Sequence, residues 1–211
     1  MTCQSLKGKV TFTSAVSTGG HDIMLIINIS ETAKEFDMNR DFLNVIYSRR
    51  SVRTFTGEKV QKDDLLTMLR AGMSAPSAVN VQPWAFVVVT DRGTLDELCN
   101  ELPYAKMLDK AGAAIIVCGI PDKDDTYAKD YWVMDCSLAS GNILLAAHAM
   151  GYGAVWTAAY ADKERIRSVQ RILTIPDNII PLNVIPVGVP ADRNAKPVEK
   201  FKEENIHWEK W

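Results

Sequence analysis

The stretch Ala75-Pro76-Ser77-Ala78-Val79-Asn80-Val81-Gln82-Pro83-Trp84-Ala85-Phe86-Val87-Val88-Val89-Thr90 passes from a loop of small and amide residues into an apolar run. Trp84 to Thr90 is β-branched and aromatic, and its length suits a central strand. Before it, Gln61 to Ser74 repeats apolar residues at helical spacing. Pro76 ends that helix, because proline lacks an amide donor and restricts the residue before it. The stretch therefore predicts a helix, a loop and a strand in succession.

Further elements follow on both sides of this stretch. Helices are expected at Arg40–Arg49, Leu95–Leu102, Tyr104–Lys110, Tyr127–Met150 and Asp162–Leu173, and strands at Ala113–Ile120, Ala154–Ala158 and Leu182–Val189. The last strand carries Pro186, which cannot donate to a ladder, so an edge position or a bulge is expected. Strands that alternate with helices predict an α/β or α+β fold with one mixed sheet covered by helices.

Composition excludes several classes of protein. The chain has 211 residues, 47% of them hydrophobic, so it can bury a sizeable core. A net charge of -2 argues against a nucleic-acid surface, which usually needs a concentrated basic face. The apolar runs are far shorter than the roughly 20 residues of a membrane-spanning helix. The N-terminus shows no secretory signal. A cytoplasmic protein without a nucleic-acid or membrane partner is expected.

The cysteines and histidines do not form a predicted metal site. The four cysteines lack a C-x-x-C pair and the close spacing of metal ligands, which indicates a reduced setting. Cys118 and Cys136 lie in apolar contexts and are interpreted as small hydrophobic residues. His148 is interpreted as a hydrogen-bonded buried or interface histidine rather than a base.

Arg49-Arg50-Ser51-Val52-Arg53 is a candidate phosphate site. Three guanidinium groups and a hydroxyl fall within five residues, and arginine can bind phosphate through bidentate, charge-assisted bonds. The alternative is that basic residues decorate a helix C-terminus and complement its dipole. Both interpretations remain open from the segment alone.

The loop at 75–84 is a second candidate site. Its two prolines alone would explain a helix-stop loop, but they do not explain the concentration of Ser77, Asn80 and Gln82 before a buried strand. A flat ligand edge with carbonyls and ring nitrogens would use these donors and acceptors. By contrast, Gly151-Tyr152-Gly153 is interpreted as a helix cap, because it follows a helix and lacks the third glycine of a dinucleotide fingerprint.

Four segments together resemble the nitroreductase-like, FMN-dependent flavoprotein family. They are residues 49–53, residues 75–84, Gly151-Tyr152-Gly153-Ala154-Val155-Trp156 and Ile185-Pro186-Val187-Gly188-Val189-Pro190. Their order and spacing also match, and the resemblance covers roughly residues 40–211. It implies an α+β fold with a central, mainly antiparallel mixed sheet flanked by helices, and an intertwined homodimer with FMN at the subunit interface. It further implies ping-pong hydride transfer from NADH or NADPH through FMN to a nitroaromatic, quinone or similar acceptor.

The resemblance also implies roles for individual residues. Arg49, Arg50 and Ser51 resemble the phosphate and ribityl contacts, and Arg53 resembles the cation beside flavin N1 and the C2 carbonyl. In the family, one segment meets the flavin from the other subunit. The residues of this chain that resemble it are Pro76, Ser77, Ala78, Asn80 and Gln82. A family strand passes the N5 edge of the flavin, and the residues that resemble it here are Trp156, Thr157, Ala158 and Ala159. Lys200 resembles a basic phosphate ligand of the tail, where the family often has arginine, and Lys106 resembles a lysine near the pyrimidine, although a surface helix lysine would fit Lys106 equally. No catalytic side chain and no metal ligand is predicted.

The expected organisation is an extension over residues 1–38 and a flavin-binding domain over residues 39–211. Residues 191–211 form an arm that is expected to embrace the other subunit. The alternatives are a specialised enzyme of the same fold, such as a dehalogenase or a flavin-fragmenting enzyme, and a non-catalytic FMN-binding module. The short connection from Asp122 to Tyr127 leaves no obvious lid of the specialised kind.

Overall fold

The computed structural model describes residues 4–6, 9–11 and 41–211. It divides into two units, residues 1–47 and 48–211, which are considered separately. In the first unit, β1 (Gln4–Leu6) pairs antiparallel with β2 (Lys9–Thr11), and residues 41–47 are helical. Most of the expected extension at 1–38, with Arg40 after it, lies outside the described residues.

The second unit is built on an antiparallel five-stranded sheet. Its elements in chain order are α2 (Lys62–Met73), η1 (Ala78–Asn80), β3 (Trp84–Val89), α3 (Arg92–Glu101), η2 (Lys106–Asp109), β4 (Ala113–Gly119), η3 (Pro121–Lys123), α4 (Ala128–Ala149), β5 (Gly153–Ala154), β6 (Thr157–Ala158), α5 (Lys163–Leu173), β7 (Ile180–Gly188) and η4 (Glu203–Asn205). The strand order is β3-β4-β7-β5, with β6 also paired to β7. The fold class is therefore α+β, as expected.

Two predictions about the strands need correction. The strand expected at Ala154–Ala158 is two short strands, β5 and β6, interrupted at Val155 and Trp156. The edge position expected for the strand with Pro186 is wrong, because β7 lies between β4 and the β5/β6 pair. Val155 N–H donates to the carbonyl of Pro186 over 3.4 Å, so this carbonyl faces the interruption between β5 and β6. The carbonyl and the nitrogen of one residue point to the same side of an antiparallel strand, so the nitrogen of Pro186 faces the interruption too. No ladder bond is lost there, and the proline is tolerated. The expected bulge does occur in β7, where the register with β4 shifts and skips Leu182.

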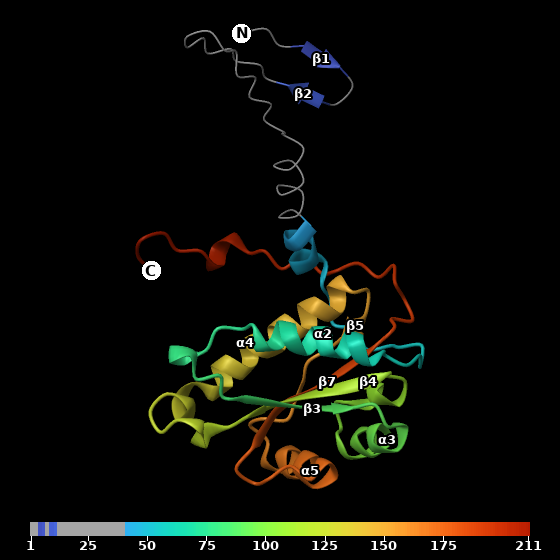
Figure 1. The fold of residues 1–211 in the computed structure, drawn as a ribbon, viewed down its shortest axis with the longest axis vertical. Helices are drawn as coiled ribbons and strands as arrows, with labels where there is room; N and C mark the ends of the chain where they lie inside the picture. The colour runs from blue at the N-terminus through green and yellow to red at the C-terminus, as the bar shows by residue number, and fades with distance from the viewer. Residues whose placement is uncertain (1–3, 7–8, 12–40) are drawn as a thin grey trace, which may run out of the picture. The chain divides into compact units, whose positions relative to one another are not determined.

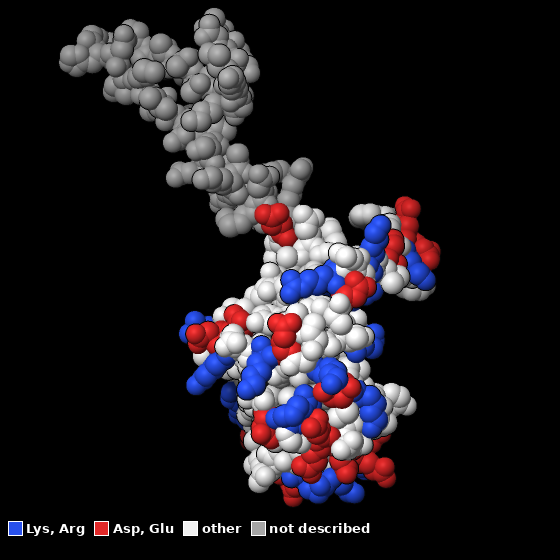
Figure 2. All heavy atoms as spheres, turned by 90° about the vertical axis from the view of Figure 1, so that its right-hand side faces the viewer, with Lys and Arg blue, Asp and Glu red and all other residues white. Residues whose placement is uncertain are grey.

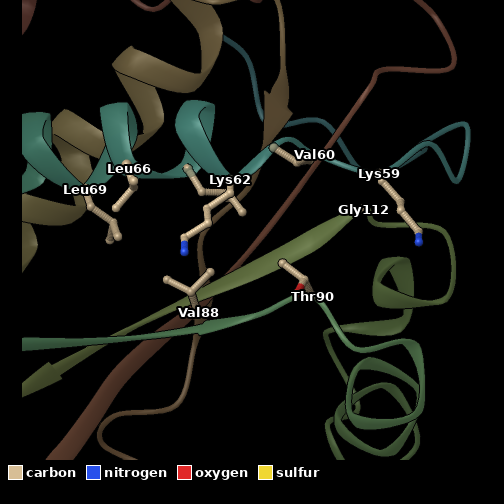
Figure 3. A pocket seen from close by; sticks show the side chains of 9 residues that line it. Lys59, Val60, Lys62, Leu66, Leu69, Val88, Thr90 and Gly112 are labelled. Atoms are coloured by element: carbon tan, nitrogen blue, oxygen red, sulfur yellow. The ribbon is translucent and has the colours of Figure 1, made fainter.

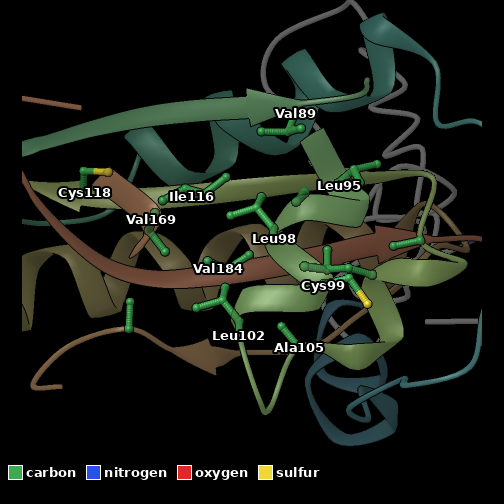
Figure 4. Close-up of a cluster of buried hydrophobic side chains, with 14 of the residues drawn as sticks. Val89, Leu95, Leu98, Cys99, Leu102, Ala105, Ile116, Cys118, Val169 and Val184 are labelled. Carbon is green, nitrogen blue, oxygen red and sulfur yellow. The ribbon is translucent and has the colours of Figure 1, made fainter. Parts of the chain in front are cut away.

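Helices cover both faces of the sheet. Figure 1 shows α2 and α4 on one face and α3 and α5 on the other. Under α3 and α5, a cluster of buried aliphatic side chains includes Leu98, Ile116 and Val184 (Figure 4). Under α2 and α4, a second cluster includes Met68, Ile115 and Ile143. These two cores fix the sheet from both sides. The helix expected at Tyr104–Lys110 is shorter, a single 3-10 turn at η2.

α4 is the longest helix among the described elements, and its ends are well defined. Asp124 Oδ1 accepts from the backbone N–H groups at its N-terminus, with Thr126 donating over 3.0 Å. At its C-terminus Gly151 has a φ of +82° and donates to the carbonyl of His148 over 3.0 Å. The predicted glycine cap is thus confirmed. One strip of α4 is both apolar and exposed in the single chain, with Tyr131, Met134 and Leu138 at 43%, 57% and 48% exposure.

No helix among the described residues is long and apolar enough to cross a bilayer. On the face in Figure 2, lysine and arginine are interspersed with aspartate and glutamate over the described residues. That face therefore offers no large basic area of the kind that binds a nucleic-acid backbone.

Candidate functional site

The arginine segment leaves the helix that ends at residue 48 and is fixed against the sheet. Val52 N–H donates to the carbonyl of Ala154 over 3.1 Å, and Thr56 N–H donates to the carbonyl of Val189 over 3.0 Å. The side chain of Val52 is buried against Gly153, where an added Cβ would lie 2.7 Å from Val52 Cβ. Ser51 and Arg53, on either side of Val52, are exposed. The sheet therefore holds the backbone and leaves the hydroxyl and the guanidinium accessible.

Arg49 and Arg50 are half-buried and lie close to His148. Arg50 donates to the backbone carbonyl of Asp192, at the start of the arm. Burial and, after it, the charges of Arg49 and Arg50 hold the pKa of His148 below its ordinary value. Among the ion pairs formed within residues 41–211, none involves Arg49, Arg50 or Arg53. The segment thus concentrates positive charge that no carboxylate of the described residues neutralises by an ion pair, and such charge suits an anion site.

The loop at 76–82 has an unusual backbone. Val79, Asn80 and Gln82 have φ values of 41°, 61° and 55°, a left-handed region in which a β-branched residue such as Val79 is a genuine outlier. Two side-chain bonds close the loop on itself. Gln82 N–H donates to Ser77 Oγ over 2.9 Å, and Gln82 Nε2 donates to Asn80 Oδ1 over 2.9 Å. The polar residues predicted to meet a ligand therefore form one connected unit.

Two charged residues from other elements hold this loop in place. Ala78 N–H donates to Oδ1 of Asp135, a buried residue in the middle of α4, over 3.1 Å. Lys123 Nζ, at the end of η3, donates to the carbonyl of Gln82 over 2.7 Å. Strained backbone persists only where its surroundings over-determine it, and such strain clusters at functional sites. The loop has the properties of a preorganised binding segment.

Within one chain, the loop and the arginine segment lie at different positions along α4. Asp135 contacts the loop, whereas His148, thirteen residues later on the same helix, contacts Ser48 at the start of the arginine segment. At 1.5 Å per residue, this spacing corresponds to about 20 Å along the helix. A single chain therefore does not bring the arginine segment and the loop, the two predicted parts of the site, together.

The segment predicted to pass the flavin N5 edge lies where β5 gives way to β6. Thr157 Oγ1 donates to the carbonyl of Val184 over 2.7 Å, and Ala159 N–H donates to the carbonyl of Leu182 over 3.0 Å. Trp156 is half-buried, Thr157 and Ala159 are buried, and Ala158 is exposed. The structure thus places this segment on β7, with Ala158 as its accessible member.

The two predicted lysine contacts differ in how firmly they are placed. Lys106 donates from Nζ to the carbonyl of Cys99 over 2.7 Å and to that of Asn100 over 3.2 Å, which satisfies the C-terminal end of α3. That end belongs to the face of the sheet opposite α4 (Figure 1). Lys200 is exposed on the arm. Neither ammonium contacts Arg49, Arg50 or the loop through any bond between described residues.

An apolar groove of about 440 Å³ lies between α2 and the edge of the sheet. Figure 3 shows Leu66 and Leu69 of α2 above Val88 of β3, with the side chain of Lys62 reaching into the space between them. None of the predicted site residues lines this groove. The candidate site is therefore distinct from it.

Sequence reasoning missed the residues that hold the two segments. Asp135 and Lys123 contact the loop across 57 and 41 positions of the chain, and no local pattern predicts such contacts. One signal was available for Asp135, since an aspartate inside an otherwise apolar helix is rarely buried without a partner. The prediction that His148 is hydrogen-bonded is confirmed by its contact with Ser48 Oγ at 2.8 Å.

Comparison with known proteins defines the class that this fold and these segments represent. The model of the nitroreductase family matches residues 46–103 and 94–189. The chain belongs to the nitroreductase family.

Individual relatives agree with this assignment. The chain is 42% identical over 171 residues to a protein of Archaeoglobus fulgidus named "Putative NADH dehydrogenase/NAD(P)H nitroreductase", covering 80% of this chain and 98% of that protein. A crystal structure of a protein of the same name from Bacteroides thetaiotaomicron is similar with a TM-score of 0.76 and 49% identity, over 81% of this chain and 98% of the other. An "FMN reductase [NAD(P)H]" of Bacillus subtilis is 25% identical over 175 residues, which cover 74% of this chain and 68% of that protein.

Proposed function

We propose that the protein is a homodimeric, FMN-dependent NAD(P)H oxidoreductase. The observation that carries the proposal is a separation of about 20 Å along α4. It lies between the preorganised polar loop and an arginine segment that forms no ion pair with the described carboxylates. Two such half-sites in one chain become complete sites when a second copy supplies the missing wall. Family membership and the similarity to an FMN reductase support the choice of flavin.

The residues present fit FMN. Arg49, Arg50 and Ser51 offer two cations and a hydroxyl for the phosphate, and none of these arginines is committed to a carboxylate among the described residues. Asn80 and Gln82 present amide groups, already linked to one another, for the polar edge of the ring system. Trp156 to Ala159 and Lys200 would complete the pocket, and Lys106 would join it only by leaving its carbonyl partners at α3.

The exposed strip of α4 favours the homodimer. Tyr131, Met134 and Leu138 follow one another on one side of the helix and leave apolar area uncovered in the single chain. Burying apolar surface is the main favourable term in association. The arm also exposes apolar side chains, with Trp208 and Trp211 at 80% and 100% exposure. We infer that both surfaces contact the second subunit.

When bound, FMN supplies the redox chemistry by accepting a hydride from NADH or NADPH and passing electrons to a nitroaromatic, quinone or similar acceptor. The residues of this chain bind and orient the cofactor and set its electrostatic surroundings. Arg53 is exposed beside the fixed Val52 and would stabilise negative charge on the reduced ring. No side-chain acid or base is required, because protons can come from water.

The test is to purify the protein and measure bound flavin, mass in solution and reduction. We expect a yellow dimer with one FMN per chain, bleached anaerobically by NADH or NADPH and recoloured by a quinone or nitroaromatic. Protein that binds no added FMN would contradict the proposal. Flavin that neither nucleotide bleaches would favour a non-catalytic FMN-binding module, and turnover confined to a halogenated substrate or to the flavin itself would favour a specialised enzyme.

A further inference from the structure

Tyr152, in the turn Gly151-Tyr152-Gly153, is a residue that the proposed chemistry does not use. The two glycines serve the backbone: Gly151 has a φ of +82° at the end of α4, and an added Cβ at Gly153 would lie 2.7 Å from Val52 Cβ. The phenol of Tyr152 instead leaves the turn and donates to Asp64 Oδ2 over 2.6 Å. Because Asp64 lies in the first turn of α2, the phenol links two elements across 88 positions of the chain.

The bond between Tyr152 and Asp64 has the geometry of a strong hydrogen bond. A distance of 2.6 Å falls in the range for a hydroxyl that donates to a carboxylate. The ring of Tyr152 is half-buried and packs against the apolar cluster beneath α2 and α4, which fixes its position. The hydrogen bond to Asp64 and, after it, burial raise the pKa of Tyr152 above its ordinary value, so the phenol remains a donor near neutral pH.

β5, which follows Tyr152 directly, supports the arginine segment. Ala154 of β5 forms a parallel bridge with Ser51, and the carbonyl of Ala154 accepts from Val52 N–H over 3.1 Å. Ser51 is the residue predicted to offer its hydroxyl to the phosphate, and it lies between Val52 and the two arginines at 49 and 50. The position of β5 therefore sets the position of the predicted phosphate ligands.

β5 is too short to be held firmly by strand pairing alone. It has two residues, Gly153 and Ala154, which pair with β7. Tyr152 N–H adds a bond to the carbonyl of Ala147 at the end of α4, over 2.8 Å. The phenol adds a further attachment, to α2. Since so short a strand has few ladder bonds, this side-chain bond is a substantial part of what fixes β5.

We propose that Tyr152 is a positioning residue for the phosphate site: its hydrogen bond to Asp64 holds β5 and thereby places Ser51 and the adjoining arginines for a phosphate monoester. This inference rests on the proposed function, in which FMN carries that phosphate. Riboflavin has the same ring system without the phosphate. A comparison of the two flavins therefore separates a role at the phosphate from a role in the stability of the whole fold.

The experiment measures the dissociation constants of FMN and riboflavin for full-length variants. Tyr152→Phe removes the hydroxyl and keeps the ring, and Asp64→Ala removes the acceptor. Each should lower the ratio of the riboflavin constant to the FMN constant by about threefold, a change that the net contribution of one hydrogen bond can supply. Asp64→Asn keeps an oxygen that can accept from the phenol and should restore most of the ratio. The double variant should lose no more than either single variant, since both remove the same bond.

Asn142→Ala is the matched control. Asn142 Nδ2, in α4, donates to the carbonyl of Ala71 in α2 over 3.0 Å, so this bond also attaches another element to α2 but does not involve β5. The variant should lose stability in urea unfolding and keep the wild-type ratio of dissociation constants. Tyr152→Phe should lose stability as well, so the ratio, and not the stability, decides the test.

The two proposals can fail separately. If FMN binds at one per chain and Tyr152→Phe and Asp64→Ala keep the wild-type ratio, the inference about Tyr152 is wrong and the proposed function stands. Equal loss of affinity for both flavins would also overturn the inference, because the phenol would not act at the phosphate. If the wild type binds no flavin, the proposed function fails and inorganic phosphate decides the inference. Phosphate binding that Tyr152→Phe weakens about threefold and Asn142→Ala leaves intact supports it, and unchanged or absent phosphate binding overturns it.

Discussion

The backbone N–H of Ala78 donates to Oδ1 of Asp135 over 3.1 Å, and so the middle of α4 holds a loop that precedes β3. The other oxygen, Oδ2, is buried and has no hydrogen-bond partner among the described residues. The bond fixes the first residue of the turn in which Val79 and Asn80 have positive φ. Asp135 is therefore a positioning residue for the loop.

Replacing Asp135 should loosen the loop. Asp135→Ala leaves Ala78 N–H without its acceptor, which costs about 1–3 kcal/mol of the free energy of unfolding. If about 1 kcal/mol of this cost falls on the bound loop, FMN binding weakens about fivefold. Asp135→Asn keeps an acceptor and should bind FMN more tightly than the alanine variant. Thermal unfolding and FMN titration measure both effects. Asp130→Ala, at an exposed position in the first turn of α4, is the control, and equal behaviour of the two alanine variants would contradict the assignment.

The arginine segment should determine affinity for the phosphate and not for the ring. Arg49→Ala and Arg50→Ala should each weaken FMN binding by about 10- to 100-fold, since hydrogen bonds to charged groups contribute about 1.5–3 kcal/mol. Riboflavin affinity should change little. Arg171→Ala, which removes surface ion pairs to Glu97 and Glu101, is the matched control and should bind FMN like wild type. Equal loss of affinity for FMN and riboflavin would show that the arginines do not contact the phosphate.

Much of the fold was predictable because its signals are local. Periodic apolar residues predicted α2 within one residue at each end, and Asp162 was predicted at the start of α5, where its Oδ1 accepts from Glu164 and Arg165 N–H. The position of Pro186 was not predictable, because its missing donor is tolerated by an interruption in neighbouring strands that only the assembled sheet reveals.

The site divides in the same way. The arginine segment and the amide-rich loop could be recognised as motifs, since each is contiguous in sequence. Their roles as opposite walls remain a prediction, because the contacts that place them reach Ala154, Asp135 and Lys123 across long stretches of chain. The sequence shows that Asp135 lies within an apolar helix, but it does not show that Ala78 is its partner.

Close packing of Gly119 against Trp132 should make this position intolerant of a side chain. A Cβ at Gly119 would lie 2.0 Å from Cε3 of the Trp132 ring, which is buried and also stacks edge-on with Tyr160 at 4.9 Å. Gly119→Ala should destabilise the fold by about 1–3 kcal/mol or more through overpacking. Gly141→Ala, where an added Cβ meets nothing within 4 Å, should change the free energy of unfolding by no more than about 1 kcal/mol in either direction. Urea unfolding of both variants checks the difference, and equal midpoints would refute it.

The buried cysteines should resist alkylation in the native protein. Burial raises the pKa of Cys118 and of Cys136 to about 12, so at pH 9 only roughly one thiol in a thousand is the reactive thiolate. Because these pKa values are raised, reactivity should appear only as the pH approaches 12 or as the protein unfolds. Mass spectrometry after iodoacetamide treatment, with and without urea, tests this directly. Rapid labelling of either cysteine in the folded protein at pH 8 would show that its surroundings open readily.

The span of α4 between Asp135 and His148 has a genetic consequence. If each pocket draws its arginine segment from one copy and its loop from the other, a pair that joins an Arg49→Ala copy to an Asp135→Ala copy contains one pocket with both lesions and one with neither. Two genes that are each defective when expressed alone should then complement one another when co-expressed. Lesions that fall in the same half of the pocket should not, so complementation groups would map the two walls without a structure of the complex.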